Sequence, residues 1–229
     1  MPDRDESQSP ISGPAAGLIT AALRRAIRLQ SGTAKAYVRK LREDHPDESP
    51  ARIRERVDTL FLGAVTASGA AVGSTAAIPG IGTIAAFGAI GAESVLFLEA
   101  TAFYTLAVAE VHGLDVHSSE HEELLVMTVM LGASGTALLA NAVGSSAGSA
   151  KNVSLASRAL RIPGLAEINK RMLNRFVRKF AVKKAGLALG KLAPAGVGAV
   201  VGGWGNRKLG RTVVETADAT FGAPPGEWS

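Results

Sequence analysis

One short stretch of the chain combines the residue types of a metal site. Residues 112–123, HGLDVHSSEHEE, hold three histidines among four carboxylates. His117 and His121 are four residues apart, so in a helix they would share a face, as two metal ligands can. Ser119, however, has capping-box spacing to Glu122 and is the expected N-cap, which leaves His117 outside the helix. Acids in a first helical turn are also explained by the helix dipole, so we expect no metal site.

Three carboxylates on one apolar segment are the next candidates for chemistry. Glu99 and Glu110 are eleven residues apart and share a helix face, and Glu93 precedes them. Inside an apolar bundle, such groups would form a proton- or cation-sensitive site. The simpler alternative, which we favour, is that they pair with Lys or Arg or face water.

The motifs of common enzyme classes are missing from the sequence. The chain has no cysteine, no phosphate-binding loop, no dinucleotide-binding glycine motif after a strand, and no Gly-x-Ser-x-Gly nucleophile elbow. We therefore expect a protein that is not an enzyme, with no catalytic residues and no cofactor.

Basic amphipathic segments give the clearest functional signal. Residues 169–191 contain the apolar stripe Leu173, Phe176, Val177 and Phe180 among many cations, and residues 21–42 contain seven Lys or Arg and no acid. Helices of this kind lie at the surface of anionic membranes. The residues expected to bind membrane anions are Lys170, Arg171, Arg175, Arg178, Lys179, Lys183, Lys184, Arg24, Arg25 and Arg28.

Two other interpretations of these cations remain. Residues 93–123 carry seven acids and no Lys or Arg, so the basic segments could pair with them inside the protein. Clustered cations also attract nucleic acid. The chain, however, has no recognised DNA- or RNA-binding motif, and only 5% of its residues are aromatic and could stack on bases. We expect no nucleic acid partner.

The apolar patterns predict an all-α fold without strands: a single bundle of closely packed, Gly/Ala-rich helices. Pro50 follows the expected N-cap Ser49 at a helix start, and Gly113 is placed to end a later helix. The expected helices cover roughly 14–42, with a break at Ser31-Gly32 left open, 50–77, 83–112, 120–143 and 165–189, with one or two more before 222. The expected organisation is a disordered tail (1–13), a basic amphipathic helical segment (14–48), a helical domain (49–222) and a C-terminal tail (223–229).

An uncharged stretch from Leu60 to Ala92 is long enough to cross a membrane. It is rich in Gly and contains Pro79, and few of its residues are Leu, Ile, Phe or Val, which favours a buried helical core. Insertion of a hairpin broken at IPGIG (78–82) remains the alternative. The related stretches 78–88 and 193–203 would both start Gly-rich helices that could pack on each other.

Two motifs resemble the EcsC protein family. One is LAVAEVHGLD (106–115), with His112 where the family often has Tyr. The other comprises Lys191, Pro194, Gly198, Gly202, Asn206, Gly210 and Arg211, with Val213 or Val214 where a small residue is usual. The resemblance covers roughly Pro50 to Phe221. It implies a helical, membrane-associated protein without an established enzymatic activity.

From these observations we expect a non-enzymatic protein at the cytoplasmic face of the cell membrane, either peripheral or partly inserted. The first ten residues are polar and lack the pattern of a secretory signal. The expected partners are anionic membrane lipids, with a membrane protein as a further candidate. The alternatives are a soluble module that binds an acidic protein, and a membrane-perturbing protein that exposes its apolar hairpin.

Overall fold

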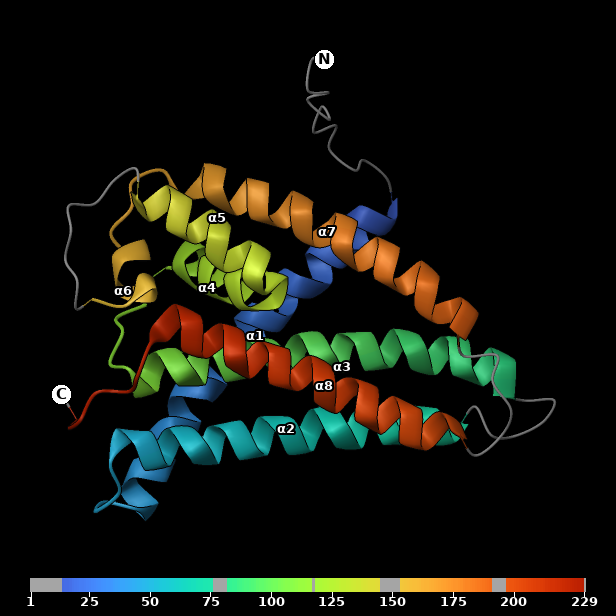
Figure 1. Cartoon of the computed structure of the whole chain (residues 1–229), viewed down its shortest axis with the longest axis horizontal. Helices are drawn as coiled ribbons and strands as arrows, with labels where there is room; N and C mark the ends of the chain where they lie inside the picture. The colour runs from blue at the N-terminus through green and yellow to red at the C-terminus, as the bar shows by residue number, and fades with distance from the viewer. Residues whose placement is uncertain (1–13, 76–81, 117, 145–152, 191–196, 229) are drawn as a thin grey trace, which may run out of the picture.

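The computed structural model describes residues 14–75, 82–116, 118–144, 153–190 and 197–228. These residues form helices and contain no strand, which confirms the all-α fold class (Figure 1). The tail expected over residues 1–13 lies outside them. The helices are α1 (Pro14–Asp44), α2 (Pro50–Thr75), α3 (Gly82–Val111), α4 (Ser119–Leu131), α5 (Ala133–Gly144), α6 (Leu155–Ala159), α7 (Leu165–Gly190) and α8 (Val197–Phe221).

The helices form two groups joined by α1. The long helices α2, α3 and α8 run along the length of the molecule, and α2 packs on α8 more extensively than any other pair of helices described (Figure 1). The second group pairs α4 with α7, and α5 folds back on α4. Because α1 packs on α3 and also touches α4 and α7, it links both groups into one bundle.

Several helix boundaries follow the sequence signals. Ser49 accepts a hydrogen bond from Arg52 N (3.4 Å) at the start of α2, and Gly113 ends α3 with a φ of 63°. Gly164, with a φ of 77°, precedes α7. Such positive φ values suit glycine and are rare for other residues. The first helix continues through Ser31-Gly32, so the break left open there is absent.

The helix expected over residues 120–143 is wrong in one respect, because Gly132 divides it into α4 and α5. Gly132 has a φ of 66° and a ψ of −145°, which no helix continues through. Three residues later the chain folds back so closely that a Cβ at Gly135 would lie 2.3 Å from Thr128 O. Glycine at both positions makes this corner possible.

The N-cap of α4 is Ser118, one residue before the expected Ser119. Its side chain accepts a hydrogen bond from His121 N at 3.3 Å. Glu122 makes no capping box and instead accepts a hydrogen bond from Ser31 Oγ of α1. The short helix α6 was not predicted, since five residues contain too little periodicity to detect.

Small residues bring α2 and α8 close together. A Cβ added at Gly210 would lie 2.8 Å from Val65 Cγ2, and one added at Gly203 would lie 3.5 Å from Ala70 Cβ. The expected close packing of Gly/Ala-rich helices is therefore present, and among the described residues α8 has its main partner in α2. The expected packing of stretch 78–88 on stretch 193–203 involves residues 78–81 and 193–196, which lie outside the described residues.

One described segment, Ser94–Val111 of α3, is long and apolar enough to cross a membrane, with a mean hydropathy of 1.5. In this bundle, 56% of it is buried. A core helix of a soluble protein has the same properties, so this segment is weak evidence for a span. The turn of the expected hairpin, residues 76–81, lies outside the described residues.

Candidate functional site

The apolar stripe of α7 faces the interior of the bundle. Met172, Phe176 and Val177 are buried, and Met172 Sδ lies 3.7 Å from Thr128 Oγ1 of α4. Leu173 is half-buried, and the side chain of Phe180 lies outside the described residues. The described residues of the stripe are therefore engaged in packing on neighbouring helices, and within that part of α7 the polar side remains to meet a partner.

The predicted cations of α7 differ in their surroundings. Lys170, Arg171, Arg175 and Lys179 are exposed, and Arg178 is half-buried; the side chains of Lys183 and Lys184 lie outside the described residues. Arg171 pairs with Glu167 of its own helix at 3.1 Å.

Lys179 has a structural contact that the sequence did not indicate. Its Nζ donates a hydrogen bond to Leu131 O at 2.8 Å. Leu131 is the last residue of α4, so its carbonyl has no partner within that helix. A cation at this end also complements the negative end of the helix dipole. Lys179 therefore stabilises the α4–α5 corner.

The predicted cations of α1 are all exposed. Arg24 lies 3.5 Å from Glu123 of α4, so the acidic block does meet this basic helix. Arg25 and Arg28 make no ion pair within the described part of the chain. The same is true of Lys170 and Arg175 on α7. Internal pairing with residues 93–123 thus accounts for one of these cations and leaves the other four available.

Two leucines lie on the exposed side of α1. Leu18 is 72% exposed and Leu29 is 49% exposed. Leu18, Arg25 and Leu29 follow the spacing i, i+7 and i+11, so they form one stripe along the helix. This stripe combines apolar and cationic side chains.

Of the three carboxylates proposed as candidates for chemistry, Glu110 lies near α1. Glu110 is half-buried and lines a cavity of about 10 Å³ with Ser31, Lys35 and Glu122. That volume is about the size needed for one water molecule. Glu99 is half-buried, and the side chain of Glu93 lies outside the described residues.

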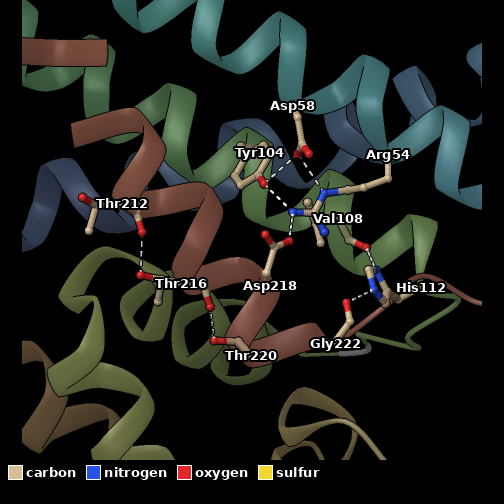
Figure 2. A network of polar contacts seen from close by, with 10 residues as sticks. All are labelled: Arg54, Asp58, Tyr104, Val108, His112, Thr212, Thr216, Asp218, Thr220 and Gly222. Atoms are coloured by element: carbon tan, nitrogen blue, oxygen red, sulfur yellow. Dashed lines mark hydrogen bonds and ion pairs between the residues drawn. The ribbon is translucent and has the colours of Figure 1, made fainter. Parts of the chain in front are cut away.

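A polar network joins α2, α3 and α8 (Figure 2), and it was not predicted from the sequence. Arg54 is only 4% exposed, and its Nε donates to Asp58 Oδ1 at 2.8 Å. Its Nη2 donates to Tyr104 OH at 2.7 Å and to Asp218 Oδ1 at 2.8 Å. Tyr104 in turn donates to Asp58 Oδ1 at 2.8 Å and stacks on Phe61.

Burial and neighbouring groups shift the pKa values of Tyr104 and Arg54 within this network. Burial raises the pKa of Tyr104 well above its ordinary value, so the phenol stays neutral and can donate to Asp58. Burial alone would lower the pKa of Arg54, but its contacts with Tyr104, Asp58 and Asp218 raise it. The groups satisfy one another, and we assign them a structural role. The spacing of Arg54 and Asp58, four residues apart, was the one signal in the sequence.

His112 ties the end of α3 to the residue after α8 (Figure 2). Its Nδ1 lies 2.8 Å from Val108 O, and its Nε2 lies 3.3 Å from Gly222 O. Burial lowers its pKa. His121 belongs to α4, and His117 lies outside the described residues. Within the residues described, no three His, Cys, Asp or Glu side chains are placed to hold a metal ion.

One residue of the second EcsC-like motif, Gly210, lies on the side of α8 that faces α2. Asn206 is buried, and Gly210 approaches Val65 as described above. Arg211 is exposed, while Lys191 and Pro194 lie outside the described residues.

No protein-family model, curated protein or solved structure matches the chain. The resemblance to EcsC proteins therefore rests on the quoted motifs alone.

Proposed function

We propose that this protein is a non-enzymatic, peripheral membrane protein that docks on an anionic bilayer at the cytoplasmic face. The observation that carries the proposal is the set of exposed cations on α1 and α7 without an ion pair among the described residues: Arg25, Arg28, Lys170 and Arg175. Each Lys or Arg near an anionic surface contributes about 1 kcal/mol to binding. The resemblance to EcsC proteins agrees with this role.

The exposed stripe of α1 supplies an apolar contribution. Leu18 and Leu29 flank Arg25 on that stripe, so docking would bury both leucines in the headgroup region while the arginine meets lipid phosphate. The core-facing residues Leu23, Ala26 and Ile27 stay in place, because they pack inside the bundle. This form of docking needs no helix to leave the bundle.

Vesicle sedimentation tests the proposal. We expect the protein to bind phosphatidylcholine vesicles that contain one-third phosphatidylglycerol and to ignore pure phosphatidylcholine. Raising the salt from about 0.1 M to about 1 M shortens the screening length from roughly 10 Å to 3 Å and should release the protein. Retention at high salt until detergent is added would instead show insertion.

A matched pair of charge reversals locates the contact. R25E/R28E should weaken binding to anionic vesicles by more than about tenfold. R39E/K40E changes the net charge equally on the same helix, but Arg39 and Lys40 already lie 3.9 and 3.1 Å from Glu43 and Asp44. This control should bind more tightly than R25E/R28E. Equal loss in both variants, or equal binding to neutral vesicles, would contradict the proposed surface.

A further inference from the structure

A second exposed face, on α8, combines a tryptophan with three cations. Trp204 is 66% exposed, and Arg207, Lys208 and Arg211 are also exposed. Their spacing, i, i+3, i+4 and i+7, places all four on one side of the helix. Lys208 Nζ lies 5.5 Å from the centroid of the Trp204 ring. None of the three cations makes an ion pair within the described residues.

The stability of α8 does not explain this face. A helix dipole favours acids near the N-terminus and bases near the C-terminus. In α8 the first turn has no acid and the last turn has no base, while Glu215 and Asp218 follow the cations toward the C-terminal end. The cations therefore lie on the N-terminal side of the acids, the reverse of the order that the dipole favours.

The packing of Trp204 does not explain its presence either. Gly203 turns toward α2, where Ala70 Cβ lies 3.5 Å from the position that its own Cβ would take. Gly205 opens to free space, with no atom within 4 Å of such a position. Trp204 thus lies between two glycines, and its large apolar indole remains exposed to water.

We infer that this α8 face is an interfacial anchor that places Trp204 in the headgroup region of an anionic phospholipid bilayer. Trp has an apolar body and one polar N–H, which suits the boundary between lipid and water. Arg207, Lys208 and Arg211 supply the charge complementary to lipid phosphates. The inference rests on the proposed membrane docking and adds a contact surface that α1 and α7 do not include.

A bilayer fits these observations better than a nucleic acid. Three cations beside one aromatic ring make a small phosphate footprint, and stacking along a strand uses successive aromatic side chains. A bilayer offers both negative charge and an apolar layer to the same four side chains.

Tryptophan fluorescence tests the inference directly, because the chain has two tryptophans. Trp228 Nε1 donates to Glu48 O at 3.0 Å, and its ring lies under Arg42, so it is held against the protein. In W228F, Trp204 is the sole reporter. On addition of vesicles with one-third phosphatidylglycerol, its emission should shift to shorter wavelength and brominated lipid should quench it. In the matched control W204F, the emission of Trp228 should stay unchanged.

Charge variants in the W228F protein measure the contribution of the cations. R207Q/R211Q should weaken vesicle binding by roughly 25-fold, about fivefold for each cation. Both side chains are exposed, so the fold should be retained, as far-UV circular dichroism would show. Wild-type affinity of this variant would overturn the inference.

The outcomes separate the two proposals. Sedimentation with anionic vesicles while the Trp204 spectrum stays unchanged would overturn the α8 anchor and leave docking through α1 and α7 standing. Absence of sedimentation would overturn both. Quenching of Trp204 by single-stranded DNA that anionic vesicles cannot compete away would replace the lipid with a nucleic acid.

Discussion

The pair α2 and α8 is held together in two different ways along its length. Toward the start of α2, the buried Arg54 donates hydrogen bonds to the exposed Asp218 of α8 and to the buried Tyr104 of α3 (Figure 2). Farther along α2, the contact is made by the close approach of small residues such as Gly203 and Ala70. The first region depends on directed polar bonds, and the second depends on the absence of side-chain bulk.

The two kinds of contact have different consequences. A buried arginine with three partners fits one arrangement of helices, because any shift leaves polar groups without partners. Glycine and alanine contacts give little transfer energy but allow the helix axes to come close. We conclude that the Arg54 network sets the register of α2 and α8, whereas the small residues set their separation.

The largest expected effect comes from removing Arg54. Arg54→Ala leaves Asp58 and the Tyr104 hydroxyl without their buried partner, and breaking such a pair costs about 3 kcal/mol of unfolding free energy. Urea denaturation followed by circular dichroism measures this loss. Arg52→Ala is the control, since Arg52 is exposed and pairs with the exposed Glu55, and it should change stability by less than about 0.5 kcal/mol. Equal stability of the two variants would contradict the role of the network.

A glycine pair on α8 tests the second kind of contact. Gly210→Ala would place a Cβ 2.8 Å from Val65 Cγ2 and should destabilise the protein by about 1–2 kcal/mol, since overpacking outweighs the gain in helix propensity. Gly205→Ala meets open space and should stabilise the protein by about 0.5–1 kcal/mol. The same denaturation experiment measures both. If Gly210→Ala were also stabilising, the helices would not be as close as the contact with Val65 requires.

A smaller effect on stability is expected from the substitution of Lys179, because this residue is exposed although its Nζ donates to Leu131 O. Lys179→Ala should lower the free energy of unfolding by about 1 kcal/mol, which corresponds to about 2–4 °C in Tm for a chain of this size. Arg175→Ala removes an exposed cation without a described ion pair and should leave Tm within about 1 °C. Scanning calorimetry distinguishes the two. A larger loss for Arg175→Ala would place Arg175 in a structural contact.

The smallest effect concerns His112, beside the network. Burial lowers its pKa below the ordinary 6.5, so the unfolded chain takes up the proton first as the pH falls. The stabilising contribution of the neutral ring is complete above about pH 6.5 and is lost as the pH falls toward the lowered pKa. Arg54 and Asp218 are the charged groups that act on this ring. His112→Gln should therefore lose less stability than the wild type between pH 7.5 and 5.5, as paired denaturation curves would show; parallel curves would contradict this.

The sequence predicted the helical fold and most helix boundaries, since Ser49-Pro50, Gly113 and Gly164 mark them through local chemistry. It predicted α4 and α5 as one helix because Gly132 alone is tolerated inside a helix. The backbone angles of Gly132 and the approach of Gly135 to Thr128 show that the chain turns there. Local signals therefore locate the ends of helices better than corners between them.

The candidate site was less predictable. Exposure of Arg25 and Arg175 agrees with the amphipathic pattern, but the same pattern could not show that Lys179 reaches Leu131 of another helix. The partnership of Arg54 with Asp218 was equally invisible, because it joins residues 164 positions apart in the sequence. Periodicity identifies which face of a helix is polar, whereas tertiary structure decides what that face meets.

The separation of Arg54 from Asp218 also bears on how the protein emerges from the ribosome. The α2 helix is synthesised long before α8, and until α8 follows, the Arg54 guanidinium has only Asp58 and Tyr104 to satisfy it. The small-residue surface of α2 would likewise be open to solvent or to a chaperone during this interval. Stalling translation before residue 197 should therefore yield a chain that is far more sensitive to protease than a chain that includes α8.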